Sequence, residues 1–93
     1  MNPIETIEKE HLAQLFFSKK EVLPDTDSQK IRQAKLYRSQ TLGNLLQTKV
    51  HLTFETADGH IYQIYTTVWA VGNDYISLKG GLTLPICSII EID

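Results

Sequence analysis

The sequence predicts an α+β fold in one domain, with a helical segment over residues 1–43 followed by a five-stranded antiparallel small β-barrel over residues 44–93. Three observations predict this fold. Apolar residues first recur at helical spacing, they alternate with polar residues after Lys49, and turn residues then separate short apolar runs. A chain of 93 residues with 42% hydrophobic and 22% charged residues is typical of a globular protein with a single core.

The first apolar residues predict an amphipathic helix over residues 4–17. A wide apolar stripe needs cover, because soluble monomers seldom expose large apolar patches. The helix could dock on its own barrel, on a second helix or on another chain, and the weak apolar face of the second helix favours another chain. We therefore expect self-association, as a two-fold dimer, through the residues of this stripe. They are Ile4, Ile7, Leu12, Leu15 and Phe16.

A linker and a second helix are predicted next. Residues 24–27 begin with a proline, which steers the preceding residue away from helical geometry. The second helix is expected over residues 28–42, with a cap at Asp27 or Ser28 and a stop at Gly43. Its apolar face is interrupted by basic residues, so its formation depends more on propensity than on burial.

Five strands are expected between Lys49 and Ile92. The run from His60 to Val71 is rich in β-branched and aromatic residues on both faces, which is typical of a long central strand that bends midway. Asp58-Gly59 predicts a hairpin turn, and Pro85 interrupts the ladder before the last strand. The residues expected to point inward are Val50, Leu52, Phe54, Ile76, Leu78, Leu84, Ile90 and Ile92.

Two resemblances follow from these runs. The second half of the chain is similar to Sm-like and SH3-like small barrels in Val50-x-Leu52-x-Phe54, Asp58-Gly59, Tyr75-Ile76-Ser77-Leu78 and Leu84-Pro85-Ile86. More narrowly, Thr41-Leu42-Gly43-Asn44, Thr66-Thr67-Val68-Trp69-Ala70 and Leu78-Lys79-Gly80-Gly81 resemble a family of short bacterial proteins with no established activity. The Sm-like resemblance implies RNA binding. However, the long strand lacks the glycine at which Sm strands bend, and Gly72-Asn73-Asp74-Tyr75 does not reproduce the Asp and Asn pair of the base-binding loop. No RNA-contacting residue is therefore carried over.

Five basic residues lie in a stretch without acidic residues between positions 28 and 54: Lys30, Arg32, Lys35, Arg38 and Lys49. Such an asymmetry can indicate a contact with nucleic acid or an acidic partner. The four helical cations spread widely around the helical wheel, whereas nucleic-acid-binding helices usually gather them on one side. Pairing with Glu5, Glu8, Glu10 or Glu21 is the simpler interpretation.

No residue is predicted to be catalytic or to bind a metal or cofactor. His11, His51 and His60 are isolated, without the close spacing of zinc ligands, and His11 is expected at least partly buried. Cys87 lies in an apolar segment with no adjacent cation, and we expect a buried structural thiol. One cysteine, no apolar N-terminal run and no stretch of membrane-spanning length predict a cytoplasmic protein without a signal peptide or membrane contact.

Four aromatic residues, Tyr62, Tyr65, Trp69 and Tyr75, crowd the predicted barrel. Exposed aromatic residues on small barrels stack bases or hold peptides, whereas buried ones fill the core. Burial is expected for Trp69, because a large ring supplies much of a small core. The sequence predicts a non-catalytic protein-interaction or self-assembly module of unknown partner. The alternative is an RNA- or DNA-binding protein that uses the basic stretch from residue 30 to residue 49.

Overall fold

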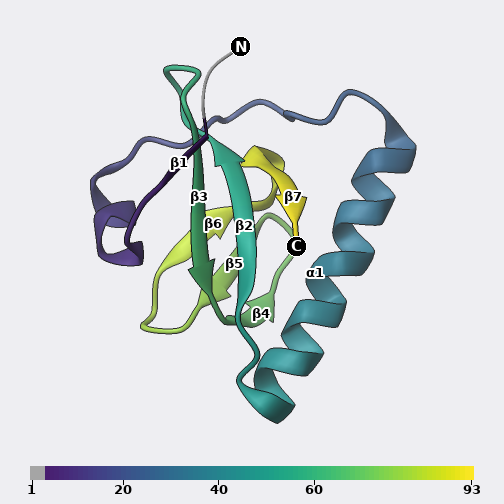
Figure 1. The fold of residues 1–93 in the computed structure, drawn as a ribbon. Helices are drawn as coiled ribbons and strands as arrows, with labels where there is room; N and C mark the ends of the chain where they lie inside the picture. The colour runs from purple at the N-terminus through teal and green to yellow at the C-terminus, as the bar shows by residue number, and fades with distance from the viewer. Residues whose placement is uncertain (1–3) are drawn as a thin grey trace.

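The computed structural model describes residues 4–93 and has an α+β fold, in which one α-helix covers the side of two stacked β-sheets (Figure 1). The described elements follow one another as β1 (Ile4–Thr6), the 3-10 helix η1 (Lys9–Gln14), α1 (Thr26–Leu46), β2 (Val50–Glu55), β3 (Ile61–Thr66), β4 (Val68–Val71), β5 (Tyr75–Leu78), β6 (Thr83–Pro85), the 3-10 helix η2 (Ile86–Ser88) and β7 (Ile89–Ile92).

The two sheets have the strand orders β1-β3-β2-β7 and β4-β5-β6. β1 runs parallel to β3, and the other pairs are antiparallel. Between residues 4 and 93 neither sheet closes on itself, so the predicted closed barrel is not seen. The openings between the sheets are instead covered by other parts of the chain. α1 packs against β4 and β7, and the N-terminal segment lies beside β3.

The predicted helix over residues 4–17 is wrong. The chain forms β1 and a short 3-10 helix there, and it is already extended at Leu15. The backbone of the next residues pairs with the hairpin that follows β2, since the Ala57 amide donates to the Phe16 carbonyl at 2.7 Å and the Ser18 amide donates to the Glu55 carbonyl at 3.1 Å. These tertiary hydrogen bonds override the helical spacing of the apolar residues.

The second predicted helix is confirmed as α1, but it is longer at both ends. Asp25, rather than Asp27 or Ser28, is the N-cap, and its side chain accepts a hydrogen bond from the Ser28 amide at 2.9 Å. The left-handed C-cap is Gln47, not Gly43. Gly43 lies inside the helix, not at its end. Because glycine has no side chain, α1 can pack closely against the Val68 carbonyl of β4 at this position.

The long strand expected from His60 to Val71 is divided at Thr67 into β3 and β4, which belong to different sheets, so six strands rather than five follow Lys49 among the described residues. The predicted bend is therefore the point where the chain crosses between sheets. Most predicted inward positions are buried, but Val50 and Ile90 are only partly buried. η2 and a bulge in β7, where Ile90 is the extra residue between the partners of Thr53 and Phe54, shift the phase of this strand. Ile89 therefore pairs with Phe54 and is buried in place of Ile90.

The hydrophobic core lies between the sheets, and each covering segment contributes one buried side chain to it. The N-terminal segment contributes Leu12 and α1 contributes Leu36. The remaining members come from β2 onward: Leu52, Phe54, Ile64, Val68, Ile76, Leu78, Leu84, Ile86, Ile89 and Ile92. Within the described chain, no helix has the length and hydropathy to cross a membrane.

Candidate functional site

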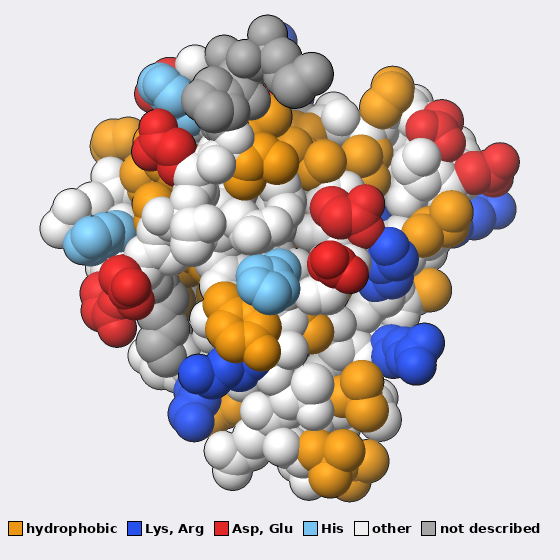
Figure 2. All heavy atoms as spheres, viewed as in Figure 1, with side chains coloured by type: hydrophobic (Ala, Val, Ile, Leu, Met, Phe, Trp, Pro, Cys, Tyr) orange, Lys and Arg blue, Asp and Glu red, His pale blue; other side chains and the backbone are white. Residues whose placement is uncertain are grey.

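The basic stretch does not form a continuous basic surface. Arg32 is only 6% exposed, and its guanidinium donates two hydrogen bonds to the carboxylate of Glu21, at 2.7 and 2.5 Å. Arg32 also donates to the Ile89 carbonyl at the edge of β7 at 3.0 Å. Lys35 forms an ion pair with Glu91 at 2.6 Å. Acidic and basic side chains therefore lie next to each other on the face shown in Figure 2.

The other three cations are exposed. Lys30 and Arg38 lie on α1, and Lys49 lies before β2 with its ammonium 5.7 Å from the centre of the Tyr65 ring. The ring of Tyr65 in turn stacks on His51, with 4.4 Å between the ring centres. This small aromatic platform lies on the four-stranded sheet, and Tyr65 is exposed to solvent.

The residues of the predicted self-association face are separated by the fold. Leu12 is in the core, and Ile7 and Leu15 pack against it, whereas Ile4 and Phe16 are exposed. The N-terminal segment therefore covers the core of its own chain, and the continuous apolar stripe from which we predicted a dimer does not exist.

The predicted burial of Trp69 is also wrong, because its side chain is 46% exposed. A β-bulge between Val68 and Ala70 changes the alternation at this position. The space between the sheets is filled by aliphatic side chains and Phe54 instead. Tyr65 and Tyr75 are exposed too, while Tyr62 is partly buried with its ring 6.0 Å from that of Phe54.

The outer face of the three-stranded sheet is uncharged. β4, β5 and β6 contain no Asp, Glu, Lys, Arg or His. Because side chains alternate across a sheet, the buried Ile76 and Leu84 leave Tyr75 and Ser77 on the outer face, opposite Pro85 and Thr83. The four-stranded sheet differs, since its strands carry three acidic residues and one histidine: Glu5, Glu55, Glu91 and His51.

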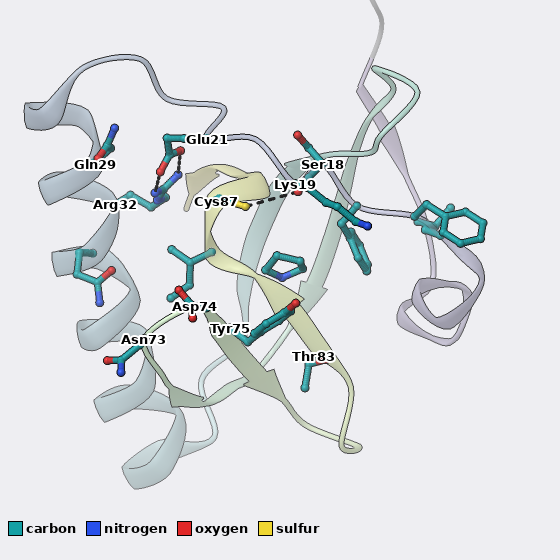
Figure 3. Close-up of a pocket in the computed structure, with 16 residues that line it drawn as sticks. Ser18, Lys19, Glu21, Gln29, Arg32, Asn73, Asp74, Tyr75, Thr83 and Cys87 are labelled. Carbon is teal, nitrogen blue, oxygen red and sulfur yellow. Dashed lines mark hydrogen bonds and ion pairs between the residues drawn. The ribbon is translucent and has the colours of Figure 1, made fainter.

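A groove of about 690 Å³ borders this uncharged face. Figure 3 shows α1 along one side of it, the chain from Ser18 to Glu21 across one end, and Tyr75 and Thr83 on the neighbouring strands. Phe16, which is 82% exposed, lines the same groove, as does Tyr75, which is 56% exposed. The sequence did not reveal this groove because its lining comes from four separate stretches of the chain. The signal available in the sequence was the absence of charge in three successive strands.

Cys87 is the nucleophile that the sequence analysis considered, and it lies in the groove. The thiol of Cys87 lines the groove, 3.5 Å from the Ser18 carbonyl, and burial raises its pKa, so the nucleophilic thiolate is disfavoured. It is partly rather than fully buried, unlike the prediction. Among the charged groups that act on the thiol, Glu21 and Asp74 raise its pKa and Arg32 lowers it.

The histidines are likewise dispersed. His60 binds Asp58 at 2.8 Å on the exposed hairpin, where hydrogen bonds from Thr56 and His60 lower the pKa of Asp58 to about 2. His11 is exposed, contrary to prediction, because its segment is not the expected α-helix. In the part of the chain that the structure describes, no three His, Cys, Asp or Glu side chains are grouped to hold a metal ion.

Comparison with known proteins gives no match to a family model, to a curated protein or to a solved structure.

Proposed function

We propose that the protein is a non-catalytic protein-interaction module, and that its binding surface is the outer face of β4, β5 and β6 together with the adjoining groove. One observation carries the proposal: Trp69 and Tyr75 are half exposed on a sheet whose strands carry no charged residue. The centres of protein interfaces are depleted in charge and enriched in aromatic residues, which contribute most of the binding energy.

The contrast between the two sheets supports this choice. A sheet with one buried face normally exposes polar residues on the other, and the four-stranded sheet does so. The three-stranded sheet exposes aromatic and small uncharged residues instead. Its outer face is thus less suited to water than that of its neighbour, and a partner would cover it.

The chemistry of the groove supports a non-catalytic role. General acid–base and nucleophilic catalysis need groups whose protonation is tuned for transfer. The raised pKa of Cys87 favours its protonated thiol, and the hydrogen bonds from Arg32 lower the pKa of Glu21, which favours its carboxylate form. A single cysteine that stays a thiol also fits our proposal of a reducing, cytoplasmic location.

Self-assembly is the homotypic form of the same proposal. A two-fold dimer that joined two such faces would bury Trp69 and Tyr75 of both copies in one self-complementary contact. Sedimentation equilibrium should then give twice the 10.6 kDa chain mass, and Trp69→Ser should return the mass to that of one chain. A 10.6 kDa mass for the wild type would exclude the homotypic form.

We further propose that the architecture is an opened variant of an SH3-like or Sm-like small barrel. The support for this relationship is that the chain crosses between the sheets at Thr67 and again at η2. Crossings of this kind allow one strand to serve both sheets of a small barrel.

RNA or DNA binding remains the second candidate, because the exposed Tyr65 ring beside Lys49 could stack on a base. It is less favoured, since Arg32 and Lys35 are neutralised by ion pairs. Binding to phosphates weakens steeply as salt rises, whereas an interface with an apolar centre does not.

The test is to capture partners on immobilised protein at about 50 and about 500 mM salt, with three variants in parallel. We expect a protein partner to be retained at both salt concentrations, lost with Trp69→Ser and Tyr75→Ser, and retained with Tyr65→Ser. Tyr65 is a matched control because it is an exposed aromatic residue of the other sheet. A partner that is released by salt and by Tyr65→Ser would contradict the proposal and favour nucleic acid.

A further inference from the structure

β6 is an edge strand, and it differs from the edge strands β4 and β7 in whether α1 forms hydrogen bonds with its outer side. The outer edge of β4 is met by α1, where the Val71 amide donates to the Gln40 side chain at 2.5 Å. The outer edge of β7 is also met by α1, where Arg32 donates to the Ile89 carbonyl. Among the described residues, β6 pairs only with β5, and no backbone-to-backbone hydrogen bond joins its other side to another segment.

The pairing pattern shows which backbone groups point to that open side. The Leu78 amide donates to the Leu82 carbonyl at 2.7 Å, and the Ile86 amide donates to the Asp74 carbonyl at 2.8 Å. In an antiparallel pair, every second residue directs its backbone groups to the neighbouring strand. The amide and carbonyl of Thr83, a residue that lines the groove, therefore point away from β5.

Pro85 limits how much of this edge can pair. It follows the same alternation as Thr83, but it has no amide hydrogen, and its carbonyl already accepts a hydrogen bond from the Ser88 hydroxyl at 2.7 Å. A strand added to β6 thus gains its backbone hydrogen bonds at Thr83 alone. Such a short ladder gives little affinity by itself, so the side chains around the groove must determine what binds.

Those side chains offer an aromatic contact and a positive charge. Phe16 and Tyr75 line the groove with their rings largely exposed. Lys19 lines it as well, and Figure 3 shows its side chain extending away from α1. Lys19 has no acidic partner among residues 4–93, whereas Glu21, the acid nearest in sequence, is neutralised by Arg32. Asp74 lines the groove as well, but Figure 3 shows it on the side next to α1, whereas Lys19 extends away from that helix. The unpaired charge at the Lys19 end is therefore positive, and it complements a carboxylate.

From this geometry we propose that β6 binds an extended segment of a partner protein as an added strand. An acidic side chain of that segment lies beside Lys19, and an apolar side chain contacts Phe16 and Tyr75. Because side chains of a strand alternate, the acidic and apolar residues are two positions apart or at adjacent positions on opposite faces. This inference rests on the proposed function and adds the chemistry of the partner to it.

The experiment is a selection of random seven-residue peptides, displayed on phage, on the immobilised full chain. We expect enrichment of peptides that combine an Asp or Glu with an aromatic or branched apolar residue. The most enriched sequence is then synthesised with a fluorescent label, and its affinity is measured by fluorescence polarisation. The absence of any enriched sequence would overturn the inference.

Two pairs of variants identify the mode of binding. Thr83→Pro removes the outward amide and should weaken the labelled peptide about tenfold, whereas Thr83→Val keeps that amide and should bind as the wild type does. Lys19→Glu should weaken binding similarly, and replacement of the acidic residue of the peptide by Lys should restore it. Circular dichroism and thermal melting verify the fold of each variant. If Thr83→Pro does not fold, the effect of Lys19→Glu on peptide binding, and its restoration by the reversed peptide, tests the inference.

The outcomes separate the inference from the proposed function. A peptide or partner protein that is lost with Trp69→Ser and Tyr75→Ser, but is unaffected by Thr83→Pro and Lys19→Glu, overturns strand addition and leaves the interaction face intact. Insensitivity to all four substitutions overturns both.

Discussion

Arg32 illustrates how a single residue can be misjudged from its sequence neighbours. Arg32 lies on the buried face of α1, together with Leu36, Ser39 and Gly43. Three of these four residues are charged, polar or without a side chain, so the buried face of the helix produces no apolar periodicity in the sequence. The cation expected at the surface is instead an internal link between α1, Glu21 and the edge of β7. Nothing in the sequence separates Arg32 from Lys30 or Arg38.

This ion pair makes stability depend on pH. Its hydrogen bonds lower the pKa of Glu21 below the ordinary value of 4.5, so the carboxylate stabilises the fold above that pH and the contribution is lost as pH falls through the lowered pKa. Glu21→Gln should lower the free energy of unfolding at pH 7 by about 1 to 3 kcal/mol, because Arg32 is buried while Glu21 is partly exposed. The difference from wild type should shrink below pH 4.5. Urea denaturation at several pH values measures both effects.

Glu91→Gln is the control, because it removes the carboxylate of the exposed pair with Lys35. Exposed pairs contribute about 0 to 1 kcal/mol, so this variant should remain close to wild type at every pH. An equal loss for the two variants would show that the Arg32 pair has no special role.

Gly43 gives a second prediction at this scale. Alanine is normally favoured over glycine in a helix by about 1 kcal/mol. At position 43, however, a Cβ would collide with the Val68 carbonyl and the Thr67 methyl group, so Gly43→Ala should destabilise the protein, by about 1 to 3 kcal/mol. Asn44→Ala, at an exposed position in the same turn, should be neutral or stabilising. Thermal melting compares the two variants. Stabilisation by both substitutions would mean that α1 lies farther from β4 than the structure shows.

At the scale of the element, period-two alternation was the more reliable signal. Leu52, Phe54, Ile76, Leu78 and Leu84 are buried as alternation predicts, because each lies in a strand whose partner fixes the register. Alternation predicted the wrong inward residue in β7, because η2 precedes that strand. The helical spacing of residues 4–17 failed because the chain gains sheet hydrogen bonds there. Those partners lie more than 35 positions away (57 − 16 = 41), beyond the reach of any local pattern.

The N-terminal segment yields a prediction of its own. Leu12 is buried between the sheets, so Leu12→Ala should cost about 2 to 5 kcal/mol in a urea unfolding experiment. Phe16→Ala removes a larger but exposed side chain of the same segment and should change stability by about 0.5 kcal/mol or less. A small effect of Leu12→Ala would mean that the segment does not pack on its own core. It would then support the prediction that the segment docks on another chain.

At the scale of the whole molecule, composition and alternation were enough to predict an α+β chain with a β-rich second half. They could not predict an open pair of sheets, because closure depends on whether strands or other segments occupy the gaps. Nor could they predict the groove, since Phe16, Gln29, Tyr75 and Thr83 become neighbours only after the sheets are stacked. The bulge that exposes Trp69 has no sequence signature here.

The single tryptophan reports directly on the proposed interaction face. Because Trp69 is half exposed, its fluorescence should resemble that of an indole in water and should be quenched readily by acrylamide in the folded protein. Tyr75→Ser should change the emission little. Addition of a bound partner should shift the emission to shorter wavelength and protect the ring from the quencher. Emission typical of a buried indole in the free protein would contradict the exposed aromatic face.

The parallel pairing of β1 with β3 also constrains the order of events as the chain is made. Ile4 pairs with Ile61, and Leu12 enters a core whose other members, apart from Leu36, come from residue 52 onward. Synthesis proceeds from the N-terminus, so the first segment leaves the ribosome long before its binding site exists. Contacts between such distant residues form slowly, because a long loop must close first. The apolar residues at positions 7, 12 and 15, which the folded core covers, therefore remain uncovered during synthesis, and nascent chains should be most prone to chaperone binding in that interval.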